Sequence, residues 1–405
     1  MNFELSHEQQ LLIDTARAFV ERELYPHEEL VERADRVPPE LIREIQRKAI
    51  ELGLFAANLP EDSGGGGLSA FDMTLLDREL GRASFALHYL VARPSNILLA
   101  CTAEQREQYL LPCIRGEKID CLAMTEPDAG SDLRGMKCKA DRQGDNYIIN
   151  GSKHFISHAD LADFVILFAA TGVEETACGS AERGPTARGP RKKITAFLVD
   201  KGTPGFSVGR DQPMMGIRGT SHLELHFDEV ELDDANLLGA EGEGLGLTLA
   251  VLGRVRLAQV AARAIGKATK ILGLTLDYAR ERKQFGQRLG DFQMVQQMLA
   301  DSEIEINAAR AALWQCAWEI DQGLDPRAKI SALKVQASET LGRVADRAMQ
   351  IFGGMGYSRD LPIERYYRDA RIYRIFDGAS EIHRGVIAKS MLKGGVSVFD
   401  PFAAE

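Results

Sequence analysis

Three long segments with helical periodicity near the C-terminus constrain the fold of this chain more than any other feature. They cover 245–285, 292–322 and 326–352. Apolar and polar residues mix along each segment at helical spacing, and helices of this length usually pack as bundles, often across a subunit interface. The C-terminal region, 239–405, is therefore predicted to be a helical bundle domain.

The middle of the chain, 118–238, has the character of a β domain. Short apolar runs lie at 120–125, 147–150, 164–168 and 195–199. The segment 221–227 alternates, with Leu223, Leu225 and Phe227 on one face. Gly-Asp and Gly-Ser pairs between the runs suit antiparallel turns, and the polar, Gly/Pro-rich stretch 171–193 is predicted to be a long exposed loop.

The N-terminal region, 1–117, is predicted to be a helical domain. Ser6 and Gln9 form a capping-box pattern, so a helix is expected to begin almost at once. Four consecutive glycines at 64–67 lack the Lys-Ser/Thr of a phosphate loop and are interpreted as a flexible surface loop. The predicted fold class is mostly α with a central antiparallel, barrel-like β domain, that is, α+β.

Composition excludes several classes of protein. The net charge of −10 argues against a general nucleic-acid binder, which needs a basic face. Six cysteines show no CxxC pair and are interpreted as reduced thiols. No signal peptide is recognisable and no apolar run approaches the roughly 20 residues that span a bilayer, so no membrane span is expected. A cytoplasmic, bacterial-type location is expected, with the mitochondrial matrix open for a mature chain.

Two polar stretches of the β region have residues suited to a flat, polar ligand. Residues 124–133 place hydroxyls and carboxylates around Pro127 and Gly130 in a tight loop, although a self-bonded polar turn explains the same composition. Residues 150–158 put Phe155 and Ser157 on one face of a strand. His154 and His158 lie four apart in this strand without a third ligand, so no metal site is predicted.

Two stretches of the helical region could contact phosphates. The basic residues of 280–289 can neutralise a pyrophosphate, although a solvated basic face explains them equally well. The Gly-Gly turn in 349–357 lets a ligand approach the backbone, and a helix C-cap is the structural alternative.

Asp377, just before Gly378 and a predicted helix start, has two possible roles. As an N-cap it would accept backbone N–H bonds and stay ionised. As a general base it would need an apolar, partly desolvated site that raises its pKa. Ile375 and Phe376 supply such surroundings only if both point the same way, so the residues alone leave this choice open.

Taken together, six motifs resemble those of the acyl-CoA dehydrogenase superfamily over essentially the whole chain. They lie, in order, at 125–132, 147–157, 280–293, 350–357, 364–372 and 376–384. The resemblance implies a three-domain fold that ends in a four-helix bundle. It also implies a homotetramer with one FAD per subunit and electron transfer to an electron-transferring flavoprotein.

The resemblance also implies roles for individual residues. The FAD-contacting positions would be Met124, Thr125, Ser131, Phe155, Ser157, Arg282, Gln284, Gln293, Gln350, Gly353, Gly354, Ala379, Ser380 and Glu381. The substrate-contacting positions would be Ser131, Arg254, Arg256, Arg310 and Gly378, with the choice between Arg254 and Arg256 left open. Asp377 would be the catalytic base, and no metal is implied.

The implied reaction is α,β-dehydrogenation of an acyl-CoA thioester. A carboxylate removes the α-proton, the β-hydrogen leaves as hydride to flavin N5, and preorganised donors stabilise the charge on the thioester oxygen. The acyl group cannot be read from the sequence.

The sequence departs from the common family pattern at several positions. Asp377 stands where glutamate is usual, and positions 253–257 carry no alternative carboxylate. Gln284, Ala379 and Phe155 replace threonine, threonine and tryptophan, respectively. Two alternatives therefore stay open: an oxidase similar to the nitroalkane oxidases, which use aspartate as the base, and a weakly catalytic homologue that binds flavin or CoA.

Overall fold

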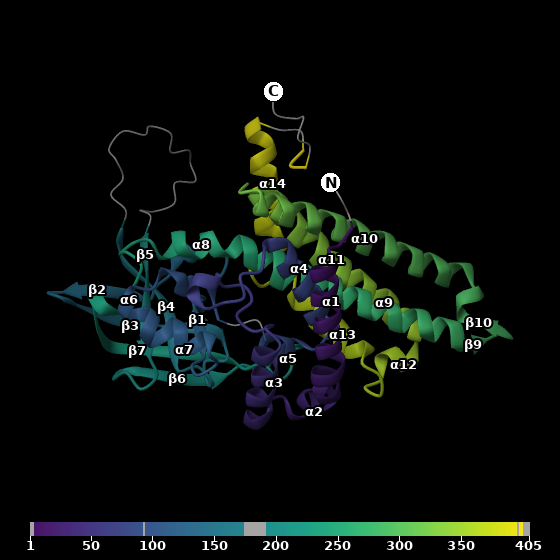
Figure 1. The fold of residues 1–405 in the computed structure, drawn as a ribbon, viewed down its shortest axis with the longest axis horizontal. Helices are drawn as coiled ribbons and strands as arrows, with labels where there is room; N and C mark the ends of the chain where they lie inside the picture. Colours follow the sequence, from purple (N-terminus) through teal and green to yellow (C-terminus); the bar gives the residue numbers. More distant parts are fainter. Residues whose placement is uncertain (1–3, 92–93, 174–191, 395–396, 400–405) are drawn as a thin grey trace. The chain divides into compact units, whose positions relative to one another are not determined.

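The computed structural model describes residues 4–91, 94–173, 192–394 and 397–399 (Figure 1). These residues form two compact units. The helical unit comprises the described parts of 1–92, 215–219 and 252–405, and the sheet unit comprises those of 93–214 and 220–251. The chain therefore belongs to the mostly helical α+β class, as the sequence predicted.

The sheet unit is built on one mixed sheet. Its strands are β1 (Asp120–Ala123), β2 (Lys139–Gln143), β3 (Asn146–Ser157), β4 (Phe164–Val173), β5 (Lys192–Asp200), β6 (Phe206–Asp211), β7 (His222–Asp233) and β8 (Leu237–Leu238). The strands follow the order β6-β7-β3-β2-β4-β5-β8, and β1 pairs with β4. Most pairs are antiparallel, as expected, but β1 and β2 both pair in parallel with β4.

The strands of the sheet unit differ in how they are buried. Six consecutive residues of β4, from Phe164 to Ala169, are buried, as are those of β5 from Ile194 to Val199. Strand β7 alternates as predicted, with Leu223, Leu225 and Phe227 buried. The short helices α6 (Ala103–Gln105) and α7 (Leu111–Ile114) belong to this unit.

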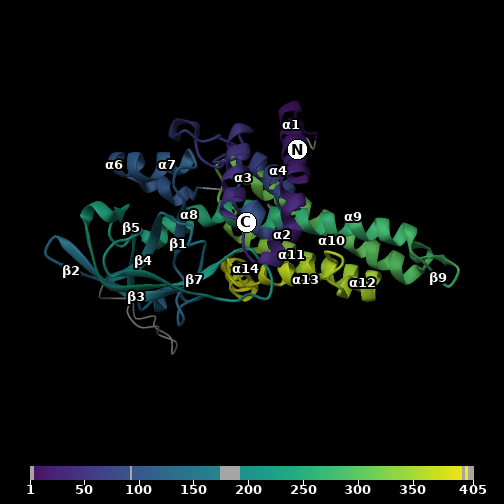
Figure 2. The same ribbon diagram turned by 90° about the horizontal axis from the view of Figure 1, so that it is seen from below.

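The helical unit contains the N-terminal helices and the bundle (Figures 1 and 2). The N-terminal helices are α1 (His7–Phe19), α2 (Glu28–Ala34), α3 (Pro39–Glu51), α4 (Ala70–Leu80) and α5 (Phe85–Tyr89). The bundle contains α9 (Arg263–Glu281), α10 (Gln293–Asp321), α11 (Arg327–Phe352), α12 (Gly354–Tyr357), α13 (Ile363–Ile372) and α14 (Ser380–Gly394). The predicted capping box at the start of α1 is present, because Ser6 Oγ accepts from Gln9 N.

Two glycines let α4 and α9 approach each other closely. A Cβ atom at Gly266 would lie 1.9 Å from Arg78 O, and one at Gly81 would lie 2.3 Å from the Cα of Arg263. The bundle also caps α4, since the Asp321 carboxylate accepts from the backbone N–H groups of Ala70 and Phe71. The N-terminal helices and the bundle therefore share one packed interior.

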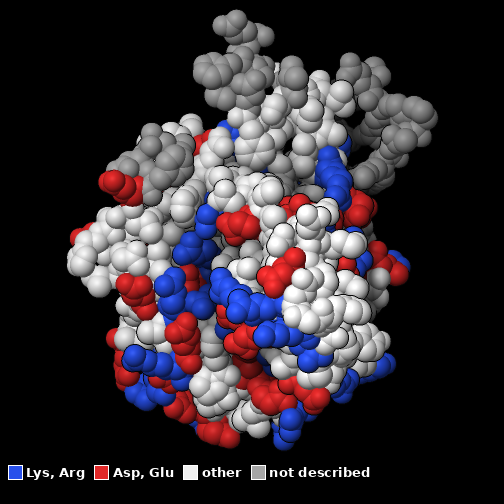
Figure 3. Space-filling view, turned by 90° about the vertical axis from the view of Figure 1, so that its right-hand side faces the viewer, with Lys and Arg blue, Asp and Glu red and all other residues white. Residues whose placement is uncertain are grey.

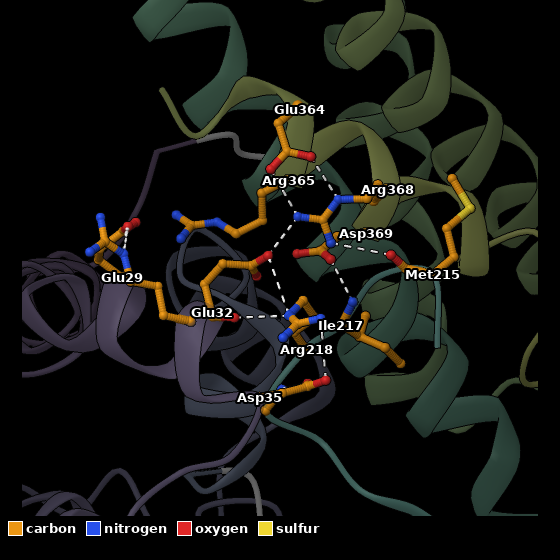
Figure 4. A network of polar contacts seen from close by, with 12 residues as sticks. Glu29, Glu32, Asp35, Met215, Ile217, Arg218, Glu364, Arg365, Arg368 and Asp369 are labelled. Atoms are coloured by element: carbon orange, nitrogen blue, oxygen red, sulfur yellow. Dashed lines mark hydrogen bonds and ion pairs between the residues drawn. The ribbon is translucent and has the colours of Figure 1, made fainter. Parts of the chain in front are cut away.

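Residues 215–219, within the connection between β6 and β7, are anchored in the helical unit between α2 and α13 (Figure 4). Ile217 N donates to Asp369 Oδ1 at 2.6 Å, and Gly219 N donates to Asp35 Oδ1 at 3.0 Å. Arg368 of α13 donates to Met215 O and pairs with Glu32 of α2. Backbone and side chains thus fix this segment at both ends.

One continuous helix, Gly244–Glu281, combines α8 (Gly244–Val255), a π-helical stretch (Arg256–Ala262) and α9. Among the described residues it alone is long and apolar enough to span a membrane, by length and composition. Core helices of soluble proteins meet the same criterion, and from Leu257 onward this helix packs in the bundle core. The helix therefore does not indicate a membrane span.

After α9 the chain forms a hairpin of β9 (Lys283–Gln284) and β10 (Gln287–Arg288), where the sequence had predicted helix to 285. Phe285 and Gly286 at its tip both have positive φ, which suits a tight two-residue turn.

The face in Figure 3 carries a short band of Lys and Arg side chains bordered by Asp and Glu. No extended basic surface covers this face.

Candidate active site

Asp377 lies in the turn between α13 and α14. Asp377 and Gly378 have consecutive left-handed conformations, with φ of 52° and 95°. The turn is closed by backbone bonds from Ile375 N to Ile372 O and from Ser380 N to Arg374 O. Aspartate tolerates this conformation better than most residues, and glycine adopts it freely.

The Asp377 carboxylate does not cap α14. Ser380 N, at the start of α14, bonds to Arg374 O, and the N–H groups of Ile382 and His383 bond to Ala379 O. Among the described residues, no donor bonds to either carboxylate oxygen of Asp377, which is partly exposed. The capping interpretation is therefore wrong, and the lone pairs of this carboxylate are available to a ligand.

Basic side chains hold the backbone around Asp377 instead. Arg256 Nε donates to Asp377 O at 2.9 Å, and His383 Nε2 lies 3.2 Å from the same oxygen. Lys334 Nζ donates to Gly378 O at 2.8 Å. Because a carbonyl can only accept, His383 carries a proton on Nε2.

Burial raises the pKa of the Asp377 carboxyl above its ordinary value, and the cations Arg256, Lys334 and Arg263 oppose this rise. Burial also lowers the pKa of Lys334 to about 8, against the attraction of Asp377. The pKa of His383 falls to about 4, mainly through burial, so its ring is neutral at pH 7. A partly desolvated carboxylate with retained basicity is suited to proton abstraction.

The two apolar residues before Asp377 point in different directions. Ile375 is 53% exposed, whereas Phe376 packs edge-on against Tyr373 and Phe85, at ring-centroid distances of 5.1 and 6.1 Å. Phe376 therefore fixes the turn on the core of the helical unit, and only this residue adds to its apolar surroundings.

In the sheet unit, a buried ion pair joins the two polar stretches that the sequence singled out. Lys153 Nζ lies 2.8 Å from Glu126 Oε1, with side chains 0% and 3% exposed. Glu126 also accepts from the backbone N–H groups of Lys137 and Cys138, and His154 N donates to Thr125 O. The loop after β1 and the end of β3 therefore form one rigid region.

The residues of this region differ in exposure. Phe155 is 44% exposed and has φ of 58° at a β-bulge, which presents its ring outward. Met124, Thr125 and Ser157 are partly exposed, and Ser131 is exposed. An exposed aromatic ring beside hydroxyls fits contact with a flat heteroaromatic ring.

The Gly-Gly turn after α11 offers open backbone. Gly353 has φ of 61° and ψ of −136°, a conformation almost restricted to glycine. A Cβ atom on Gly353 or Gly354 would meet nothing within 4 Å. Gln350, Gln293, Arg282 and Gln284 are also exposed. This part of the bundle fits a phosphate-bearing ligand that lies against the backbone.

Known protein families match this chain over almost its whole length. Models of the N-terminal, middle and C-terminal domains of acyl-CoA dehydrogenase match residues 6–117, 121–230 and 242–392. The chain belongs to the acyl-CoA dehydrogenase family. It is therefore an oxidoreductase family member with the three-domain fold that the motifs implied.

Individual acyl-CoA dehydrogenase relatives support this assignment over the whole length. The chain is 38% identical to "Acryloyl-CoA reductase (NADH)" of Anaerotignum propionicum over 401 residues, covering 97% of this chain and 96% of the relative. It is 37% identical to "(R)-benzylsuccinyl-CoA dehydrogenase" of Thauera aromatica over 422 residues, covering 100% of both.

Solved structures give the same result. Butyryl-CoA dehydrogenase from Megasphaera elsdenii matches with a TM-score of 0.84 and 33% identity, over 97% of this chain and 100% of the other. An FAD complex of PigA matches with a TM-score of 0.87 and 28% identity, over 97% of this chain and 100% of PigA.

The structure separates the predicted substrate-contacting residues of this family member. Arg256 bonds to the Asp377 carbonyl, whereas Arg254 is exposed and two positions away, which is roughly 200° around a helix. Arg310 is partly exposed, donates to Asn307 Oδ1 and lies over the Trp314 ring. Of the three predicted arginines, only Arg256 contacts the predicted base residue Asp377. Gly378, also predicted to contact the substrate, directly follows Asp377 in the sequence.

Of the predicted flavin-contacting residues after Asp377, Ala379 is partly exposed and Glu381 is exposed. Ser380 is buried, and its Oγ has no hydrogen-bond partner within the described ranges. Among the described residues, no group of three or more His, Cys, Asp or Glu side chains could hold a metal ion.

Lys334, His383 and Arg263 were missed by sequence reasoning. Lys334 and Arg263 each lie on the buried, apolar face of a helix. The buried neighbours of Lys334 in the sequence are Ile330, Leu333, Ala337 and Leu341, and those of Arg263 are Ala261 and Ala264. A charged residue on an apolar helix face was the signal that could have found both.

Proposed function

We propose that this chain is an FAD-dependent acyl-CoA dehydrogenase in which Asp377 removes the α-proton of an acyl-CoA thioester. The observation that carries this proposal is the Asp377 carboxylate. It accepts no hydrogen bond among the described residues, and burial raises the pKa of this carboxyl. A base that accepts no cap bond has its lone pairs free for a substrate proton.

The residues of the chain that would hold FAD fall into two sets. Phe155, Thr125 and Ser157 of the sheet unit suit the flavin ring, and Gly353 with Gly354 of the helical unit suits the phosphate part of the FAD held by a neighbouring subunit. Bound FAD supplies the acceptor for the hydride that leaves the β-carbon. Arg256, His383 and Lys334 hold the carbonyls of the Asp377 turn, which aims the base at one position.

The reaction balances without a further reactant besides the flavin. The α-C–H bond breaks and its proton passes to an Asp377 carboxylate oxygen. The β-C–H bond breaks with both electrons, the acyl group gains a double bond, and the cofactor is reduced. An electron-transferring flavoprotein is the proposed acceptor of these electrons afterwards.

The assembly and setting that we propose follow from family membership. A homotetramer would cover exposed apolar residues of the bundle, such as Phe285, Met294 and Tyr357, which are 95%, 80% and 80% exposed. Acidic net charge and free thiols suit a cytoplasmic location. The acyl group stays open, since the relatives named above act on different acyl chains by their names.

Anaerobic addition of a panel of acyl-CoAs to the purified holoprotein tests this function. We expect at least one to bleach the flavin absorbance near its visible maximum, and Asp377→Asn to abolish that bleaching while FAD remains bound. No bleaching with any acyl-CoA, together with oxygen consumption on a nitroalkane, would favour the oxidase alternative.

A further inference from the structure

Lys334 is a buried lysine whose ammonium lies at the predicted base without touching its carboxylate. The side chain is 0% exposed, and Nζ donates to Gly378 O at 2.8 Å. Among the described residues, no carboxylate lies within ion-pair distance of this ammonium. Burying a cation in this way is costly, so a compensating role at this place is expected.

Two side chains of α11 contact the backbone on either side of Asp377. Ser338, one helical turn after Lys334, donates to Tyr373 O at 3.0 Å. Lys334 Nζ donates to Gly378 O, so side chains of α11 hydrogen-bond to the backbone both before and after Asp377. Since no described residue donates a hydrogen bond to the carboxylate itself, these contacts and those to Asp377 O set where it lies.

We infer that Lys334 is a positioning residue for the proposed reaction: it fixes the Asp377–Gly378 turn through the Gly378 carbonyl and stabilises the ionised carboxylate by its charge. This inference rests on the proposed function. It assigns two separable effects to one side chain, a hydrogen bond that sets geometry and a charge that sets proton affinity.

Other charged groups face the same place and must be considered. Arg256 from the π-helical stretch lies beside Asp377 O and repels Lys334, whereas Glu339 of α11 and Glu381 of α14 attract it. The neutral His383 ring of α14 completes the surroundings. Removing Lys334 takes one of the two cations that hold the turn, and Arg256 remains.

Lys334→Met removes both the donor and the charge while keeping the side-chain volume. We expect flavin reduction by the acyl-CoA that reduces the unaltered holoprotein to slow by about 100-fold, because the base is misplaced. The acid limb of the rate should move to higher pH by about one unit, since ionised Asp377 loses a stabilising cation.

Lys334→Gln separates the two effects, because an amide can donate to Gly378 O but carries no charge. Its rate should lie between those of the unaltered protein and Lys334→Met, with the acid limb shifted as in Lys334→Met. If Lys334→Met does not fold, Lys334→Gln still tests the charge effect through its acid limb.

Lys329→Met is the matched control, since Lys329 lies on the same helix and pairs with Glu319, away from Asp377. It should leave the acid limb in place. An independent readout is an infrared pH titration of the Asp377 carboxyl band, identified as the band missing in Asp377→Asn. In Lys334→Met the protonated band should persist to higher pH.

The inference is overturned if the rate of flavin reduction in Lys334→Met stays within twofold of that of the unaltered protein and the pH of its acid limb does not change. It is also overturned if Lys329→Met shifts the acid limb by as much as Lys334→Met does. Failure of the proposed function is distinguishable, because the unaltered holoprotein would then not be reduced by any acyl-CoA in the panel.

Discussion

The carboxylate of Asp77 and the guanidinium of Arg263 form an ion pair inside the helical unit, with 2.6 Å between Oδ1 and Nε. Their side chains are 0% and 1% exposed. The second carboxylate oxygen of Asp77 and Nη2 of Arg263 have no hydrogen-bond partner in the part of the chain that the structure describes. The pair crosses the interface of α4 and α9, close to the turn that carries Asp377, whose charge Arg263 stabilises.

Breaking this pair on one side is expected to be severe. Asp77→Ala leaves the Arg263 charge buried without a partner and should lower the free energy of unfolding by about 3–5 kcal/mol. Replacing both residues, as Asp77→Leu with Arg263→Met, should recover much of this loss. Urea unfolding of the single and double variants measures the coupling, and additive losses would contradict a specific pair.

The α4–α9 approach gives a second prediction with its control on the same helix. A Cβ at Gly266 would lie 1.9 Å from Arg78 O, whereas one at Gly273 would meet nothing within 4 Å. Gly266→Ala should therefore lower the unfolding midpoint. Gly273→Ala should raise the free energy of unfolding by up to about 1 kcal/mol through helix propensity. Equal effects of the two changes would show that backbone contact is not limiting.

The Glu126–Lys153 pair is expected to set the shape of the loop 125–132. Glu126→Ala removes the acceptor for two backbone N–H groups and leaves Lys153 buried and unpaired, so local hydrogen exchange in the loop should accelerate. FAD should also dissociate faster, as followed by recovery of flavin fluorescence. Lys137→Ala is the control, because its partner Asp128 is exposed. Unchanged exchange in Glu126→Ala would refute this role.

The length of the base offers a fourth prediction. Asp377→Glu moves the carboxylate by roughly one C–C bond, about 1.5 Å, while the carbonyl contacts of the turn remain. Flavin reduction should slow by about 10–100-fold, because the turn of this chain is built for the shorter side chain. A rate equal to or above that of the unaltered protein would mean that the substrate does not sit closer than in glutamate-bearing relatives.

The pH dependence of Asp377 follows from its surroundings. Burial raises the pKa of its carboxyl above the ordinary aspartate value, so the ionised base is lost as the pH falls through this raised value. The rate of flavin reduction should therefore decline on the acid side at a pH above 4, the region where an exposed aspartate titrates. Stopped-flow measurements from pH 3.5 upward locate the acid limb, and a limb at or below the ordinary aspartate pKa of about 3.9 would contradict an elevated pKa.

The long helices and the main strands could be predicted from the sequence because their apolar periodicity is strong. The helix predicted at 326–352 is observed as Arg327–Phe352, and the helix predicted at 380–393 is observed as Ser380–Gly394. The sequence did not predict the hairpin after Glu281. Its turn requires positive φ at Phe285 and Gly286, and the preceding helical periodicity favoured a longer helix there. The glycines at 64–67, expected to be flexible, instead bond through Gly65, Gly66 and Gly67 to carbonyls of residues 56–60.

The choice at Asp377 depended on information that no local pattern contains. Whether its carboxylate caps the next helix is decided by two positive φ angles and by donors from residues 256, 334 and 383. These donors are distant in sequence, so only the fold brings them to the turn. The flavin-contacting roles of residues such as Arg282 and Ser157 stay predictions.

The anchored segment 215–219 has a practical consequence for anyone who recombines this chain with a relative. The backbone passes between the two units at four places, near residues 92, 214, 219 and 251. A chimaera that imports a foreign sheet unit as one uninterrupted cassette would also import a foreign copy of the segment held by Asp369 and Asp35. Successful grafting therefore requires two inserts, spliced on either side of five host residues.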